Sequence, residues 1–310
     1  MPSLLSTLGT AVLLSPQELM KLIRSAPRRY KVYEIAKRTP GQFRVIAQPA
    51  KEVKALQHWV MNHFLNQFPV HAAATAYCVG HGIADNVRPH LNSKFLLKLD
   101  FKNFFPSLTA QDFREFIEKQ KTTLAEGDIE ALSRILFWKP KKTNDLLLSI
   151  GAPSSPLLSN LLLMDFDVNV SASCEKIGVA YTRYADDLSF SADVSSKLQE
   201  IERAVVTLCR QMKSPKLTIN PGKTVRVSKR DSRRITGLTI SNDARVFLGR
   251  DQKRRIRASV HHYVTGRLAK EQQLELKGML AYVNAVEPSF LARLRKKYGS
   301  DVIRHIQTGS

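Results

Sequence analysis

The sequence Ala180-Tyr-Thr-Arg-Tyr-Ala-Asp-Asp-Leu-Ser-Phe190 places two adjacent carboxylates between two runs rich in β-branched and aromatic residues. Such runs on either side of a short polar centre predict a strand, a tight turn and a second strand. Asp186 and Asp187 would then lie together at the tip of a hairpin, where two neighbouring charges are tolerated only if they are solvated or bind cations. An ordinary Asp-rich turn is the alternative that this stretch alone leaves open.

A third carboxylate, Asp100, ends the largely apolar stretch Lys94-Phe-Leu-Leu-Lys-Leu-Asp100. A lone Asp in such a position is commonly a turn former or a helix N-cap. If the two predicted strands are neighbours in one sheet, however, Asp100 meets Asp186 and Asp187 at a shared edge. Three carboxylates this close would not all be ionised without divalent cations, and a pair of such ions is the arrangement used for in-line phosphoryl transfer.

The charge of the chain is strongly one-sided. Its 310 residues include 48 Lys and Arg against 27 Asp and Glu, which gives a formal net charge of +21. A cationic excess of this size favours a polyanionic partner, because such a partner offsets the self-repulsion. Nucleic acid is the leading candidate, and an anionic membrane surface is the alternative.

The cysteines and the apolar segments indicate a cytoplasmic protein without a membrane partner. Cys78, Cys174 and Cys209 are far apart and form no zinc or disulfide pattern, which fits a reducing compartment. No Lys or Arg precedes Lys21, so the N-terminus lacks the basic start of a signal peptide. No apolar run approaches the roughly 20 residues that a spanning helix needs.

Hydrophobic periodicity and turn residues predict an α+β fold in which helices cover one face of a sheet. We expect β-hairpins over 30–47 and 180–190 and single strands at 94–100, 216–219 and 234–240. We expect helices at 15–25, 51–67, 109–120, 126–138, 151–170 and 195–212, followed by a basic helical tail.

Several motifs, in their order and spacing, resemble a known family. Leu99-Asp-Phe-Lys-Asn-Phe-Phe105, Gly151-Ala-Pro-Ser-Ser-Pro156 and Tyr184-Ala-Asp-Asp187 resemble the palm of reverse transcriptases. Other segments resemble the retron branch, the bacterial enzymes that make a branched RNA–DNA molecule. These segments are Arg44-Val-Ile-Ala-Gln-Pro49, Asn86-Val-Arg-Pro-His90, Leu217-Thr-Ile-Asn-Pro-Gly-Lys-Thr224 and Ile235-Thr-Gly237. The sequence departs from the family at Ile150, where Gln is frequent, and at Val87, where Ala is usual.

The resemblance implies a right-hand polymerase with fingers at 1–90, a palm at 91–240 that packs an antiparallel sheet on helices, and a basic helical thumb at 241–310. It implies an RNA-directed DNA polymerase that copies part of its own structured noncoding RNA into branched single-stranded DNA, called msDNA. Synthesis would start from the 2′-hydroxyl of an internal guanosine. The RNA, its msDNA product, the enzyme and a separate toxic effector protein would together form an antiphage defence system.

The resemblance also assigns roles to individual residues. Asp100, Asp186 and Asp187 would be catalytic and would hold two Mg²⁺ ions together with the carbonyl oxygen of Phe101. The dNTP would be bound by Arg44 at the triphosphate, by Phe105 beneath the sugar, by the Gly151 turn and by Lys223 near the pyrophosphate. An aromatic ring at Phe105 would clash with a 2′-hydroxyl, although an ordinary core aromatic is the alternative.

The residues expected to contact RNA lie in two places. Asn86 and His90 belong to the retron-like element, and a hydrogen bond within the core is the alternative for this pair. The basic tail favours a thumb that grips a duplex through its phosphates, although a charge run can be only a solvated face. Its cluster consists of Arg250, Lys253, Arg254, Arg255 and Arg257.

Two other functions remain open from the sequence. An intron-type or other bacterial reverse transcriptase shares the palm motifs. A catalytically silent palm that only binds RNA is the nonenzymatic alternative, and the retention of all three Asp residues argues against it.

Overall fold

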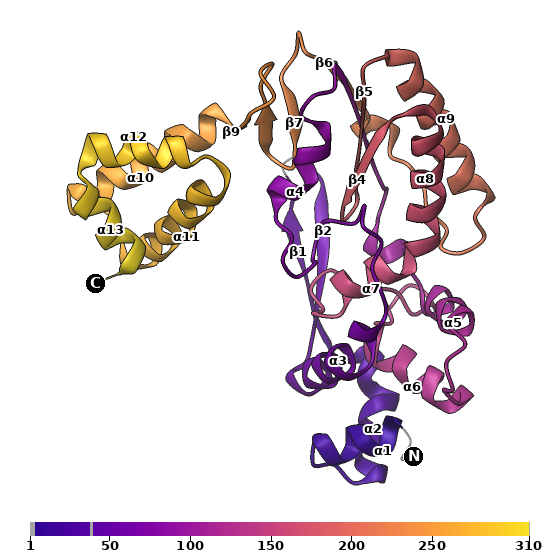
Figure 1. The fold of residues 1–310 in the computed structure, drawn as a ribbon. Helices are drawn as coiled ribbons and strands as arrows, with labels where there is room; N and C mark the ends of the chain where they lie inside the picture. Colours follow the sequence, from indigo (N-terminus) through magenta and orange to yellow (C-terminus); the bar gives the residue numbers. More distant parts are fainter. Residues whose placement is uncertain (1–3, 38–39, 310) are drawn as a thin grey trace.

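The computed structural model describes residues 4–37 and 40–309, and Figure 1 shows the C-terminal helices gathered on one side of the β-sheets. Two hydrophobic cores organise these residues. The larger core joins the N-terminal helices to the central sheet and its covering helices. The smaller core joins the C-terminal helices to a three-stranded sheet and also includes Val87 and Leu96. The mixed α+β class predicted from the sequence is confirmed. No helix in the described ranges is long and apolar enough to cross a membrane.

The N-terminal part consists of helices around one extended hairpin. Ser15 caps the second helix, and its capping box with Glu18 explains why the helix begins at Pro16. The hairpin pairs its strands from Tyr30 opposite Pro49 to Ala36 opposite Phe43. The elements are α1(Leu4–Ala11), α2(Pro16–Ser25), β1(Tyr30–Ala36), β2(Phe43–Pro49), α3(Lys51–His63) and α4(Ile83–Val87).

The central sheet has four antiparallel strands in the order β4-β5-β3-β6. Its strands are β3(Phe95–Asp100), β4(Ala180–Tyr184), β5(Asp187–Ala192) and β6(Val225–Ser228). In Figure 1, α8 and α9 lie along one face of this sheet. The helices of this region are α5(Ala110–Lys119), α6(Glu126–Leu136), α7(Ser155–Leu162), α8(Met164–Ile177) and α9(Ser195–Gln211).

Three predicted elements are wrong in detail. Residues 216–219 form no strand; their backbone pairs instead with the turn after β3, where Lys102 N donates to Thr218 O at 2.8 Å and Phe101 forms an isolated bridge with Ile219. The predicted strand 234–240 is two strands, because Thr236 and Gly237 turn the chain with φ of 46° and 84°. The predicted helix 151–170 is divided at Leu163, where ψ rises to 7°.

The C-terminal part is a small sheet followed by four helices. The sheet, in the order β7-β8-β9, extends past the boundary at residue 240 that the sequence suggested between palm and thumb. Its strands are β7(Arg233–Ile235), β8(Leu238–Ile240) and β9(Val246–Leu248), and the helices are α10(Arg250–Val264), α11(Lys270–Val286), α12(Pro288–Tyr298) and α13(Ser300–Thr308).

Asn86 and His90 are buried, with 0% and 1% of their surfaces exposed. The ring nitrogens of His90 lie 2.7 Å from Ser191 Oγ and 2.8 Å from Thr182 Oγ1, on strands β5 and β4. Asn86 Oδ1 accepts a hydrogen bond from Thr75 Oγ1 at 3.1 Å. The prediction that this pair contacts RNA is therefore wrong for this conformation, because neither side chain reaches the surface. The alternative, hydrogen bonds within the core, is the one found.

This burial makes His90 a source of acid sensitivity. Burial lowers the pKa of His90 from 6.5 to about 3. Above pH 6.5 the ring is neutral in both states; below it, the unfolded chain binds a proton that the folded chain does not. The free energy of unfolding should therefore fall by about 1.4 kcal/mol per pH unit from this group alone. Urea unfolding of wild type and His90→Gln between pH 7 and pH 5 measures this pH dependence of the free energy of unfolding.

We expect His90→Gln to be less stable at pH 7 but to lose less stability on acidification. The control is His63→Gln, because His63 is exposed on α3 and should leave the wild-type pH slope in place. Equal slopes for His90→Gln and wild type would contradict the assignment.

Candidate active site

The three carboxylates predicted to act together lie at one edge of the central sheet. Strands β3 and β5 pair so that Asp100 stands opposite Asp187. Phe101 N donates to Asp186 O at 3.1 Å, which ties the end of β3 to the turn between β4 and β5. Ala185 supports that turn with a left-handed φ of 56°. The interpretation of Asp100 as an isolated turn former or helix cap is wrong, because it belongs to this shared edge.

The electrostatics of the edge follow from crowding of like charges. Burial, then the charges of Asp187 and Asp100, raise the pKa of Asp186 above its ordinary value. Burial also raises the pKa of Asp187, and Lys98 on the neighbouring strand opposes that shift. Burial and the repulsion of like charges both disfavour the ionised carboxylates, so a cation at this edge stabilises the ionised forms.

Asp100 has one satisfied and one unsatisfied oxygen. Its Oδ2 accepts a hydrogen bond from Lys223 Nζ at 2.7 Å, while its buried Oδ1 has no hydrogen-bond partner within the described residues. Carboxylate oxygens are the ligands that hard divalent cations prefer, so the donor set suits Mg²⁺. The described chain holds no three such ligands already gathered around one point. Asp100 Oδ1 is open to a cation as it stands, and Oδ2 would become so if Lys223, whose side chain is 57% exposed, moved away.

Because side chains alternate along a strand, Asp100 and Asp187 lie on one face of the central sheet and Arg183 lies on the other. Asp100 and Asp187 lie on the face of the sheet that also carries His90's partners Thr182 and Ser191. Arg183 projects from the opposite face, toward α7 and α8, and is fully buried.

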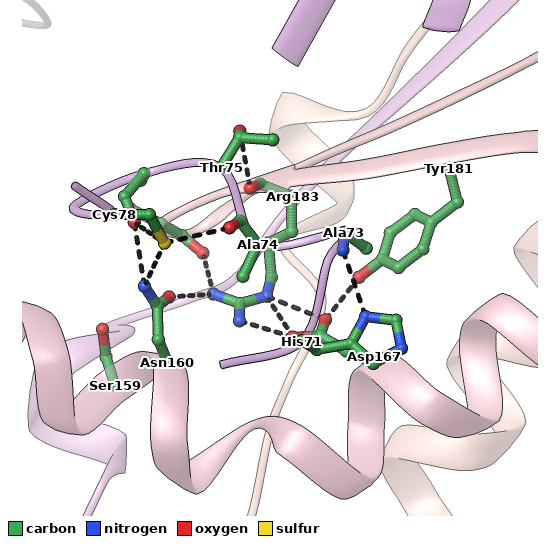
Figure 2. Close-up of polar contacts among 12 residues, drawn as sticks. His71, Ala73, Ala74, Thr75, Cys78, Ser159, Asn160, Asp167, Tyr181 and Arg183 are labelled. Atoms are coloured by element: carbon green, nitrogen blue, oxygen red, sulfur yellow. Dashed lines mark hydrogen bonds and ion pairs between the residues drawn. The ribbon is translucent and has the colours of Figure 1, made fainter. Parts of the chain in front are cut away.

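Arg183 binds four oxygens from three elements (Figure 2). Its guanidinium donates to Asp167 of α8 through Nε at 2.9 Å and Nη2 at 2.5 Å. Nη1 donates to Asn160 Oδ1 of α7 at 3.1 Å and to the carbonyl of Ala185 at 3.2 Å. Tyr181 OH also donates to Asp167, at 2.7 Å. Arg183 thus links Ala185, the left-handed turn residue that precedes Asp186 and Asp187, to helices α7 and α8.

The same network holds the segment 73–78 against β4. Arg183 N donates to Ala73 O at 2.7 Å, and Thr75 N donates to Arg183 O at 2.8 Å. Asn160 Nδ2 donates to Ala76 O at 2.8 Å, as Figure 2 shows for Asn160 and its neighbours. This anchoring positions Tyr77, whose ring centroid lies 6.4 Å from that of Tyr184.

Tyr77 lies between the carboxylate edge and the N-terminal hairpin. Burial, followed by the charge of Asp186, raises the pKa of Tyr77, and the charge of Arg44 lowers it. Tyr77 is therefore within electrostatic reach of both residues, although they come from β2 and the β4–β5 turn. Together with Phe105, it lines a cavity of about 390 Å³ that also includes the turn at 149–156.

Gly151 has a packing role in this cavity wall. Its φ is +123°, and a Cβ would lie 3.0 Å from Ala47 O and 3.2 Å from Gln48 Cγ. Ala47 N also donates to Ile150 O at 2.9 Å. Glycine is thus required for the turn to lie against β2, the strand that carries the exposed Arg44.

The predicted RNA-contacting residues of α10 divide into two groups. Arg250, Arg254, Arg255 and Arg257 are exposed. Lys253 is only 17% exposed, lies 2.8 Å from the buried Glu287, and sits over the rings of Phe247 and Phe290. Arg255 also pairs with Glu275 of α11, and Arg254 with Asp251. Lys253 therefore stabilises the helical packing, and its direct contact with RNA stays a prediction.

Four residues of the site were missed in the sequence, and these are Tyr77, Asn160, Asp167 and Arg183. Asp167 carried a detectable signal, because it occupies a core-facing helical position between Leu163 and Val170, where a carboxylate requires a partner. Asn160 and Tyr77 carried none, because their roles depend on contacts between distant segments.

Comparison with known proteins agrees with this geometry. The model of the reverse transcriptase (RNA-dependent DNA polymerase) family matches residues 35–240. The chain is 37% identical to the retron Ec83 reverse transcriptase of Escherichia coli, over 92% of both chains. It is 32% identical to the retron Ec86 reverse transcriptase of Escherichia coli, over 98% of this chain and 93% of the relative.

Solved structures with a similar fold include two telomerases. The apo telomerase of Candida tropicalis matches with a TM-score of 0.53 at 12% identity, over 94% of this chain and 63% of that one. The Candida albicans telomerase in complex with a fragment of telomeric RNA matches with a TM-score of 0.51 at 13% identity, over 93% and 62%. The chain thus spans less than two thirds of either telomerase, and these likenesses concern the fold alone. Its sequence relatives and its family model together show that the chain belongs to the retron reverse transcriptases, a family of RNA-directed DNA polymerases.

Proposed function

We propose that Asp100, Asp186 and Asp187 are the catalytic residues and bind two Mg²⁺ ions, with the Phe101 carbonyl as a further ligand. The register that sets Asp100 opposite Asp187, with Asp100 Oδ1 buried and unpartnered, supports this most directly. Bound Mg²⁺ would supply activation of the attacking hydroxyl and charge neutralisation at the leaving pyrophosphate. The carboxylates themselves contribute by holding a fixed set of oxygens at a crowded, partly desolvated edge.

The incoming dNTP would occupy the cavity lined by Phe105 and the 149–156 turn. Arg44 is exposed on β2 and near Tyr77, which suits a bidentate contact with the triphosphate. Gly151 would allow close approach of the turn backbone. Lys223 would exchange its contact with Asp100 for the pyrophosphate, which its exposed ammonium can reach by side-chain rotation.

The RNA template would be the protein's own structured noncoding RNA. Exposed Arg250, Arg254, Arg255 and Arg257 on α10 would contact its phosphates. The helices at 241–310 would act as a thumb that recognises the RNA by shape. Synthesis would start from the 2′-hydroxyl of an internal guanosine and give branched msDNA. A separate toxic effector would join the enzyme and its msDNA in antiphage defence.

The first test is the product formed in cells that carry the intact locus. We expect a short DNA species in total nucleic acid whose gel mobility shifts after RNase treatment, because the DNA is joined to RNA. The variant Asp186→Asn with Asp187→Asn should lose this species while the protein is still produced, because two of the three cation ligands are removed. Gel analysis of total nucleic acid measures both outcomes.

Primer extension on a simple RNA template with purified protein measures the polymerase activity separately from formation of the branched product in cells. Equal extension by wild type and the double variant would contradict the carboxylate assignment. Normal extension without any RNA-linked DNA in cells would contradict the branched product alone.

Phe105 provides the second test. Its partly buried ring lines the cavity beside the 149–156 turn, so removal should admit a 2′-hydroxyl. We expect Phe105→Ala to incorporate rNTPs more efficiently, with the ratio of kcat/KM for dNTP over rNTP falling about tenfold or more. Single-nucleotide extension with matched dNTP and rNTP measures the ratio. Phe104→Leu, at a buried neighbour, is the control for core disturbance; an unchanged ratio in Phe105→Ala would exclude a steric gate.

The third test concerns Arg183, which would act by positioning. Lysine can keep a charge near Asp167, but it cannot reach Asn160 and the Ala185 carbonyl at the same time. We expect Arg183→Lys to lower kcat about tenfold to a hundredfold, because small displacements of catalytic groups are costly. The KM for dNTP should stay close to wild type, and half-maximal activity should need more Mg²⁺.

Arg226→Lys is the control for this variant, because Arg226 pairs with Glu202 while remaining 60% exposed. A lower melting temperature with unchanged kcat at saturating Mg²⁺ would show that Arg183 contributes to stability and has no positioning role.

A further inference from the structure

A cationic cavity lies on the part of the molecule formed by α2, α5 and α6, away from the C-terminal helices (Figure 1). Its volume is about 410 Å³, and Glu130 is its only acidic lining residue among those that the structure describes. Its basic residues come from four segments of the chain: Arg24, Arg28, Arg114, Arg134 and Lys139. None of the functions proposed above uses this cavity.

Most of its positive charge is not neutralised by the protein. Arg134 pairs with Glu130 at 2.9 Å, and Arg114 donates to Glu126 at 2.6 Å. Arg24, Arg28 and Lys139 form no ion pair within residues 4–37 and 40–309. Cations that converge on a concave surface repel one another, and an anion in the cavity would relieve that repulsion.

The segments that carry these cations are fixed by backbone hydrogen bonds. Lys139 N donates to Pro27 O at 2.8 Å, which holds the loop after α6 against the end of α2. Trp138 and Leu147 exchange two hydrogen bonds, at 3.0 and 2.9 Å, and Ala110 N donates to Leu146 O at 2.9 Å. The cavity is thus a built feature of the fold, and the cations are presented in a defined arrangement.

Its lining favours a phosphate backbone over a free nucleotide. Among the described residues, no aromatic side chain lines the cavity to stack on a base, whereas Gln111 and Asn144 offer further polar groups beside the cations. Exposed Lys141 and Lys142 follow Lys139 in the same loop and continue the positive surface past the rim. A ligand that extends beyond the cavity, such as a nucleic-acid strand, uses both parts.

We propose that this cavity is a second binding site for the structured RNA, which it holds through backbone phosphates remote from the carboxylate edge and from α10. The inference rests on the proposed use of a structured RNA. The site adds affinity and fixes where the body of the RNA lies, and it reads no sequence, because phosphate contacts carry none.

The test uses the full chain with Arg24→Gln, Arg28→Gln and Lys139→Gln combined. The matched control, Lys176→Gln with Lys213→Gln and Lys216→Gln, removes three exposed cations elsewhere and the same net charge. Fluorescence anisotropy with the RNA of the locus gives Kd over a range of salt. We expect the cavity variant alone to bind at least about tenfold more weakly at 0.15 M salt, with the slope of log Kd against log salt reduced by about 2 to 3.

Equal affinity and salt slope in the two triple variants would overturn the proposal. Calorimetric titration with inorganic pyrophosphate tests whether the cavity binds a free phosphate compound instead of RNA. Loss of pyrophosphate binding in the cavity variant, with unchanged affinity for RNA, would also overturn the proposal. Extension of a simple primer–template should be alike in wild type and both variants, so failure of the cavity proposal leaves the polymerase assignment intact. Matching melting temperatures confirm that the compared proteins are folded.

Discussion

Repulsion among three carboxylates at one sheet edge is the constraint on which the site depends. The β3–β5 register brings Asp100 beside Asp187, and the turn adds Asp186 at the same edge. Such an arrangement is unfavourable for the apo protein, as the raised pKa values of Asp186 and Asp187 indicate. Lys98 and Lys223 reduce the cost, and divalent cations would reduce it further. Cation affinity and local instability therefore have the same physical origin.

The hydrogen bonds of Arg183 hold the β4–β5 turn in place despite the repulsion among the carboxylates. A buried charged group needs an opposite charge and hydrogen-bond partners. Arg183 has both, because Asp167 supplies the charge and Asn160 and the Ala185 carbonyl accept further hydrogen bonds. Removing one partner of a buried pair commonly costs about 3–5 kcal/mol. The network is thus a rigid link between helices and turn, and it also fixes the segment that presents Tyr77. The carboxylate turn and Tyr77, which lines the candidate substrate cavity, therefore share one anchor.

The sequence predicted the elements whose signals are local. The helix at 15–25 and the Asp186–Asp187 hairpin were both predicted, and the family of the chain followed from motif order. The retron relatives favour this branch over the intron-type alternative. Signals that depend on distant partners were lost. Residues 216–219 have the composition of a strand, yet they pair with the turn after β3. The edge strand β6 is only four residues long, and its alternation of Val225 and Val227 with polar residues is too short to stand out. Lys253 belonged to a charge run, and only the buried Glu287, far along the chain, accounts for its position.

Strand β3 connects the two hydrophobic cores, because its side chains pack into both of them. Leu96 packs into the smaller core with the C-terminal helices, whereas Leu97 and Leu99 pack into the larger one. A slip of one residue would exchange these faces and move Asp100 away from the edge. Loosening of the C-terminal helices would remove one of the two constraints on that register. The heat resistance of catalysis should therefore depend in part on that of the C-terminal helices, and strengthening the smaller core would protect a site that it does not touch.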